Sequence, residues 1–179
     1  MRLEIRIGGF GGQGVITMGH ILGTAASLHL GFEAVMTESY GPEARGGACK
    51  TDLVISDVPI DYPKTTSLDC LVAMNPDAYN SYKGDVRRGG VVIYDSGLFG
   101  IEDRSPGIRY VGLPATSLAA ERGNPQVANV VMLGALLKRL PGLCTLADME
   151  AAIGKAVSSR NAKLNEVNVR ALRLGFEAA

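Results

Sequence analysis

The sequence predicts an α/β fold: a three-layer α/β/α, Rossmann-like domain whose mostly parallel sheet has helices on both faces. Runs typical of strands alternate with runs typical of helices, and the first strand leads through a glycine-rich turn into a helix. No repeat, low-complexity tract or linker interrupts residues 1–179. A chain of 179 residues can bury one core without disulfides or metals, so we expect a single domain over 1–179.

The first predicted unit is a strand, a glycine loop and a helix. Polar and apolar residues alternate up to residue 7, and residues 15–30 have the length and apolar spacing of a helix. Gly31 suits the helix C-cap, and residues 32–37 read as a second strand that closes a βαβ unit. The glycine loop is therefore expected beyond the carboxyl end of a strand, near the reversal of strand order, where ligands bind in such sheets.

The remaining elements follow from turn and cap signals. Residues 38–47 combine Gly, Pro and charge without periodicity, which predicts an exposed loop. Asn75-Pro76 and Asn124-Pro125 each place a cap residue before a first-turn proline, and Thr145 to Asp148 resembles a capping box. These signals predict helices to about residue 82, over 126–140 and to about 157, a last helix over 162–174, and strands over 51–56, 68–74, 91–95 and 109–112.

Composition and charge exclude several classes of protein. Lys+Arg and Asp+Glu both number 18, so no basic surface for nucleic acid is expected. The N-terminus lacks the build of a signal peptide. The longest apolar stretch, residues 127–137, is much shorter than the roughly 20 residues that span a bilayer. We expect a cytoplasmic protein with neither nucleic acid nor membrane as a partner.

The cysteines and histidines do not form a metal-binding pattern. Cys49, Cys70 and Cys144 are far apart in the sequence, whereas an iron–sulfur cluster commonly takes four clustered thiolates. His20 and His29 are nine residues apart, which is wrong for a metal pair on one helix face. Cys49 follows the predicted loop and would suit a reactive thiol, but a buried structural thiol is the favoured interpretation. We expect no metal site and no catalytic residue in this chain.

The glycine loop is the main candidate binding site. Gly9, Gly11 and Gly14 fit the G-x-G-x-x-G pattern, and the N–H groups at the following helix start would attract an anion. A tight turn without ligand explains the pattern equally well. Glu38 lies near the place of the acidic residue that a Rossmann dehydrogenase uses, but no hydride-transfer site or P-loop lysine follows. A free-standing nucleotide-binding enzyme and a ligand-free scaffold subunit remain as alternatives.

Two longer motifs resemble a known family. Residues 9–15 (GFGGQGV) and 40–47 (YGPEARGG) are similar to the gamma family of 2-oxoacid:ferredoxin oxidoreductases. The segments 54–57, 71–74 and 129–134 resemble that family in the same order and spacing, so the resemblance covers about the first 140 residues. It implies a subunit of a heteromeric enzyme that decarboxylates a 2-oxoacid oxidatively, reduces ferredoxin and forms an acyl-CoA.

The resemblance also implies where cofactors and partners lie. Thiamine diphosphate and iron–sulfur clusters are expected in the alpha, beta and ferredoxin-like delta subunits, so the isolated chain should be inactive and could self-associate. Residues 43–50 look most like 2-oxoglutarate enzymes, which favours that substrate over pyruvate or branched-chain oxoacids. Gly9, Gly11, Gly12, Gln13 and Gly14 are the candidate contacts for coenzyme A or another anion. Tyr40, Glu43 and Arg45 are the candidate subunit-interface residues.

Overall fold

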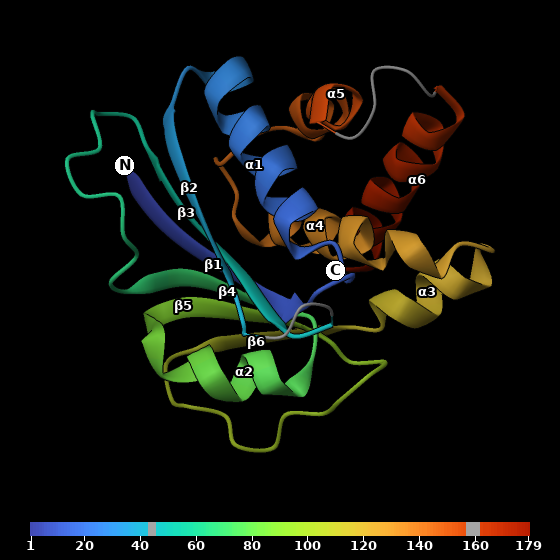
Figure 1. The fold of residues 1–179 in the computed structure, drawn as a ribbon, viewed down its shortest axis with the longest axis horizontal. Helices are drawn as coiled ribbons and strands as arrows, with labels where there is room; N and C mark the ends of the chain where they lie inside the picture. The colour runs from blue at the N-terminus through green and yellow to red at the C-terminus, as the bar shows by residue number, and fades with distance from the viewer. Residues whose placement is uncertain (43–45, 157–161) are drawn as a thin grey trace.

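The centre of the protein is a six-stranded mixed sheet (Figure 1). The computed structural model describes residues 1–42, 46–156 and 162–179. In spatial order the strands are β2 (Glu33–Tyr40), β3 (Ala48–Ser56), β1 (Arg2–Phe10), β4 (Leu68–Ala73), β5 (Val86–Asp95) and β6 (Arg109–Leu113). Strands β4, β5 and β6 follow β1 in parallel, which confirms the α/β class.

Helices cover both faces of this sheet, as predicted. On one face lie α1 (Val15–Leu30), α4 (Ala128–Arg139), α5 (Leu146–Ala156) and α6 (Ala162–Ala178), with α3 (Ala115–Glu121) beside α4 (Figure 1). The other face carries α2 (Pro76–Tyr82), which is followed by the 3-10 turn η1 (Lys83–Asp85). A second 3-10 turn, η2 (Pro125–Val127), precedes α4.

The prediction of a closed βαβ unit at the N-terminus was wrong. Strand β2 does not pair with β1; β3 lies between them and runs antiparallel to both. Its register sets Arg2 opposite Ser56 and Phe10 opposite Ala48, so β3 is paired along its full length. Strand order therefore reverses at β1, with β3 and β2 on one side and β4, β5 and β6 on the other.

Several predicted boundaries also move. Residues 38–40 were assigned to a loop but belong to β2, because their backbones pair with the start of β3, Tyr40 opposite Cys49. The helix expected over 126–140 begins as η2 and continues as α4 to Arg139, and α3 was not predicted. The Asn75 cap and the Thr145–Asp148 capping box are confirmed: the Asn75 side chain accepts from the Ala78 N–H at 2.8 Å.

The main core lies between the sheet and the four-helix face. Alternation along β1 sends Ile5 and Ile7 into this core, and both are fully buried. All residues from 128 to 137 in α4 are buried, which explains why the sequence of this helix is apolar on nearly every side.

Helices α4 and α6 meet at two glycines. A Cβ atom on Gly134 would overlap the Leu172 carbonyl oxygen and lie 2.6 Å from the Phe176 nitrogen. A Cβ atom on Gly175 would overlap the Val131 carbonyl. Because the neighbouring atoms are backbone, they cannot move aside as a side chain would. The docking of α6 therefore depends on glycine at both positions.

Gly134→Ala should lower the free energy of unfolding by about 1–3 kcal/mol or more, since the helices must separate to admit the methyl group. Gly154→Ala in α5 is the matched control, because no atom in the described part of the chain lies within 4 Å of the added Cβ. That control should be neutral or stabilising by about 0.5–1 kcal/mol. Urea denaturation of both variants measures the difference, and equal midpoints would contradict the close helix contact.

On the opposite face, a buried ion-pair network covers β1 and β3. The Arg6 guanidinium donates to both Asp52 oxygens, at 2.5 and 3.0 Å, and also pairs with Asp85. Its carbon Cζ lies 4.8 Å from the ring centre of Tyr82. Burial alone would raise the pKa of Asp52, but the hydrogen bonds and charge of Arg6, with Lys50, hold that pKa below its usual value.

Asp52→Asn should lower the free energy of unfolding at pH 7 by about 3 kcal/mol, because Arg6 stays buried with one carboxylate fewer. The Asp52 pKa is depressed on folding, so its stabilisation exists above the unfolded value of about 3.9 and disappears as pH falls through the folded value. The difference between wild type and variant should therefore shrink below about pH 4. Denaturation at pH 7 and pH 3 tests this; Glu166→Gln, in an exposed pair, should change little at either pH.

Candidate functional site at the carboxyl edge of the sheet

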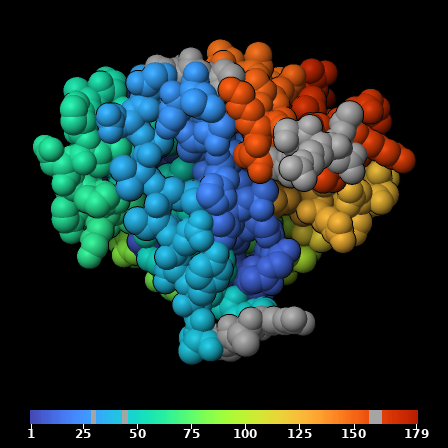
Figure 2. All heavy atoms as spheres, turned by 45° about the horizontal axis from the view of Figure 1, so that its top comes forward, coloured from blue at the N-terminus to red at the C-terminus, as the bar shows by residue number. Residues whose placement is uncertain are grey.

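The candidate site lies where strand order reverses. The glycine loop, residues 11–14, leaves the carboxyl end of β1 and enters α1, as the sequence predicts. Because β3 is antiparallel, its first residues lie at this same edge, beside the end of β2. In Figure 2 the end of β2 and the start of β3 project from the body of the molecule. The two sequence motifs therefore meet in space.

The Gln13 side chain holds the glycine loop against the sheet. Its Oε1 atom accepts from the Phe10 N–H at 2.7 Å and from the Asn75 side chain at 3.0 Å. Its Nε2 atom donates to the Met74 carbonyl at 3.1 Å. The oxygen and the nitrogen of the amide both make hydrogen bonds between β1 and β4, so Gln13 positions the loop through its side chain.

A backbone hydrogen bond joins the two motifs directly. The Gly11 N–H donates to the Gly47 carbonyl at 2.9 Å, and the Gln13 N–H donates to the Phe10 carbonyl at 3.1 Å. Two of the four loop N–H groups that the sequence analysis assigned to an anion are therefore used inside the protein. The N–H groups of Gly11 and Gln13 therefore stabilise the conformation of the loop.

Gly14 forms the start of α1 and fits against α4. Its φ of 75° lies in the left-handed region, and a Cβ atom there would lie 2.7 Å from Cγ of Asn129. The Asn129 side chain, which is buried, donates to the Gly14 carbonyl at 3.4 Å. Only glycine satisfies both the conformation and the contact.

The start of α1 leaves a set of backbone donors free. Within residues 1–42, 46–156 and 162–179, no acceptor engages the N–H groups of Gly12, Gly14, Val15, Ile16 or Thr17. Among the same described residues, no side chain caps the helix, and a Cβ on Gly12 would meet no atom within 4 Å. Unsatisfied N–H groups and the positive end of the helix dipole favour an anion. This edge can therefore hold a phosphate or a carboxylate.

Tyr40, on the strand beside the loop, is exposed and contacts Glu38. Tyr40 is 65% exposed, and its hydroxyl donates to Glu38 at 2.9 Å. Glu38 also lies 3.5 Å from Nε2 of His20, an exposed histidine. Glu38 is thus an exposed partner of these two side chains, at the edge strand.

Cys49 is buried next to this edge. Burial, with the charge of Glu38, raises the pKa of its thiol, so it stays protonated at neutral pH. The structural interpretation of Cys49 from sequence agrees with this environment. No group of three or more His, Cys, Asp or Glu residues suited to a metal ion occurs in the described part of the chain. There, too, no helix is both long and apolar enough to cross a membrane.

The family described as pyruvate ferredoxin/flavodoxin oxidoreductase matches residues 4–178. The chain belongs to this family.

A relative from Methanocaldococcus jannaschii, 2-oxoglutarate synthase subunit KorC, is 47% identical over 100% of this chain and 95% of its own length. The crystal structure of a keto/oxoacid ferredoxin oxidoreductase gamma subunit from Geobacter sulfurreducens superposes with a TM-score of 0.82 at 38% identity, covering 99% of this chain and 96% of that one. The 2-oxoglutarate:ferredoxin oxidoreductase of Magnetococcus marinus, solved with 2-oxoglutarate, coenzyme A and succinyl-CoA, shares the fold at TM-score 0.90 and 23% identity, with 99% of this chain matching 31% of that one.

These findings confirm the resemblance to gamma subunits of 2-oxoacid:ferredoxin oxidoreductases. They also confirm an oxidoreductase role that this chain plays as one subunit of a heteromeric enzyme. In this chain the residues of the two motifs that the structure describes meet at a single edge of the sheet.

The predicted site residues divide into three groups. Gly9, Gly11, Gly12, Gln13 and Gly14 come together at the carboxyl edge, and Tyr40 lies on the neighbouring strand. Glu43 and Arg45 lie outside the described residues. Sequence reasoning missed Asn75 and Asn129 as supports of the loop, since Asn75 was read only as a helix cap and Asn129 only as part of a motif.

Gln13→Ala should loosen the loop without unfolding the protein. Removing Oε1 leaves the Phe10 N–H and the Asn75 side chain without their acceptor, so the Phe10 amide should exchange with solvent at least tenfold faster. Hydrogen exchange followed by NMR measures this. The control Gln126→Ala, at an exposed position, should leave Phe10 protected; unchanged exchange in Gln13→Ala would contradict the positioning role.

Proposed function

We propose that this chain is the gamma subunit of a 2-oxoglutarate:ferredoxin oxidoreductase, and that its glycine edge contributes to binding coenzyme A. The observation that carries the substrate assignment is the 47% identity, over the full chain, to a protein named as a 2-oxoglutarate synthase subunit. The complete enzyme would decarboxylate 2-oxoglutarate oxidatively, pass two electrons to ferredoxin and transfer the acyl group to coenzyme A.

The redox cofactors are assigned to other subunits. Thiamine diphosphate would supply carbanion chemistry and iron–sulfur clusters would carry the electrons, in alpha, beta and ferredoxin-like delta partners. The three cysteines of this chain are free, and burial raises the pKa of Cys49, Cys70 and Cys144. An iron–sulfur cluster commonly takes four clustered thiolates, whereas the three cysteines here are far apart in the sequence. This supports the assignment of the iron–sulfur clusters to the partner subunits.

The glycine edge fits a phosphate of coenzyme A better than it fits a side chain of a partner. The free N–H groups at Gly12, Gly14 and the first turn of α1 form a concentrated set of donors. No atom of the described residues lies within 4 Å of a Cβ placed on Gly12. Several convergent N–H donors match the several oxygens of a phosphate, whereas one carboxylate would engage two of them. In this arrangement the chain binds and orients the acyl acceptor.

Thr17→Glu tests the site in the assembled enzyme. A carboxylate in the first turn of α1 would compete for the helix N-terminus and repel a phosphate, so the KM for coenzyme A should rise about tenfold, equivalent to about 1.4 kcal/mol. Thr24→Glu, the same change two turns further along α1, is the matched control and should leave KM unchanged. The measurement is 2-oxoglutarate-dependent ferredoxin reduction at varied coenzyme A.

A KM that rises equally in both variants, or in neither, would contradict coenzyme A binding at this edge. The substrate assignment is tested separately by comparing kcat/KM for 2-oxoglutarate with that for pyruvate and 2-oxoisovalerate. A preference for either of the other two acids would contradict it.

A further inference from the structure

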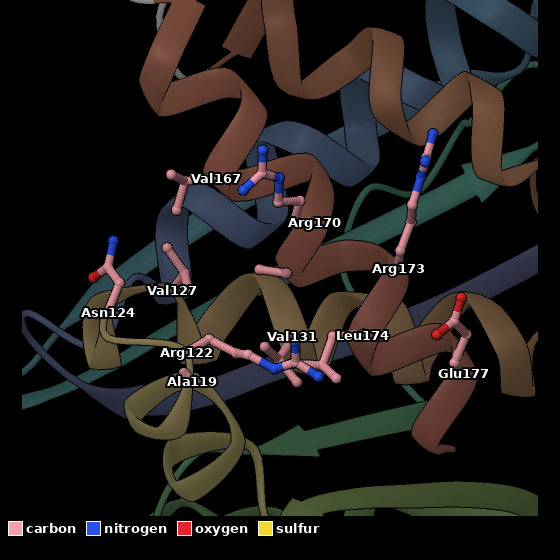
Figure 3. A pocket seen from close by; sticks show the side chains of 11 residues that line it. Ala119, Arg122, Asn124, Val127, Val131, Val167, Arg170, Arg173, Leu174 and Glu177 are labelled. Carbon is pink, nitrogen blue, oxygen red and sulfur yellow. The ribbon is translucent and has the colours of Figure 1, made fainter.

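A cavity of about 350 Å³ opens between α6 and the α3–η2 turn (Figure 3), and none of residues 9–14 of the glycine edge lines it. Its floor is apolar and is made by Ala119, Val127, Val131, Val167, Ala171 and Leu174. The innermost of these, Ala119 and Val131, are fully buried, so the cavity reaches the main core. Its size lies at the lower end of the range of about 300–1,000 Å³ for ligand pockets.

Positive charge surrounds this apolar floor. Arg122, Arg170 and Arg173 line the cavity, against the single acid Glu177. The chain as a whole has a formal net charge of +0, so this excess of arginine is local to the groove.

The three arginines differ in how they are held. Arg173 donates to both carboxylate oxygens of Glu150, at 2.6 and 3.0 Å, and points from α6 toward α5 (Figure 3). Arg170 is paired with Glu166, one turn earlier on α6. Both of these side chains are therefore already neutralised by intramolecular carboxylates.

Arg122 is different. Among the residues that the structure describes, no hydrogen bond or ion pair engages its guanidinium. Figure 3 shows its side chain lying across the groove beside Val131 and Leu174. Its backbone is fixed, because the Arg122 N–H donates to the Ala119 carbonyl at 3.2 Å at the end of α3. The Arg122 guanidinium, which has no partner among the described residues, therefore lies beside an apolar pocket on a backbone that is held in place.

We propose that this groove docks another subunit of the oxidoreductase, which inserts one apolar side chain into the pocket and places an Asp or Glu carboxylate on Arg122. A buried apolar anchor beside an arginine is the composition of an interface hot spot. Because Arg170 and Arg173 are paired within the chain, the complementary charge that the partner supplies is the carboxylate on Arg122. The groove lies on helices, whereas Tyr40 ends β2 at the edge of the sheet, so the groove would be a second contact.

The proposal rests on the role of the chain as a subunit, not on coenzyme A binding. It is tested by measuring the affinity of this full chain for the remaining subunits of the enzyme, purified together without it and immobilised. Arg122→Glu should weaken binding at least tenfold, and the salt dependence of binding should become shallower. Arg122→Lys retains the charge and should recover most of the affinity.

Arg88→Glu is the matched control, since Arg88 is an exposed arginine near the start of β5, far along the chain from the groove. It makes the same charge change and should bind like wild type. Circular dichroism and thermal unfolding of each variant confirm that the fold is kept.

Equal affinity of Arg122→Glu and Arg88→Glu would overturn the docking proposal. So would an effect of Arg122→Glu that appears only in self-association of the isolated chain, since the occupant would then be a second copy. If the wild-type chain fails to bind the remaining subunits at all, the subunit role itself fails, which separates the two conclusions.

Discussion

The antiparallel pairing of β3 with β1 is the constraint on which the candidate site depends. If β2 paired with β1 directly, as in a simple βαβ unit, the start of β3 would not run along the end of β1, where Phe10 now lies opposite Ala48. With β3 between them, the Gly47 carbonyl accepts from the Gly11 N–H at 2.9 Å. One hydrogen bond thus connects the two motifs that are most characteristic of the sequence.

The supports around this contact make the edge rigid before any ligand arrives. The Gln13 amide joins the loop to β4, and Asn129 joins the start of α1 to α4. Preorganised donors lose little entropy on binding, which favours affinity. The polar face of the sheet contributes in the same way, since the buried pair of Arg6 and Asp52 fixes β3 against β1.

Local sequence signals predicted the class of fold and most of its elements. The alternation around Ile5, the Gly31 cap and the Asn75 cap each have a local cause, because the side chain or backbone acts on residues within one turn. Pairing of β3 between β1 and β2 has no such local signal, since either order buries the same apolar face.

The sequence predicted where the candidate site lies but not the contacts that hold it. Spacing identified the loop, but it could not reveal that the Gln13 side chain binds Asn75 and Met74, residues that lie about sixty positions further along the chain. Nor could it distinguish the engaged N–H of Gly11 from the free N–H of Gly12. The groove at Arg122 depends on how α3 and α6 each pack against α4, and α3 had no cap signal in the sequence.

The central claim is that the loop N–H groups divide into engaged and free sets, and that the free set binds the anion. Backbone amide shifts of the ¹⁵N-labelled chain, followed during titration with coenzyme A, test this most directly. The account predicts large shifts at Gly12, Ile16 and Thr17, and small ones at Gly11 and Gln13. Shifts centred on Gly11 and Gln13, or no shift at this edge at saturating coenzyme A, would contradict it.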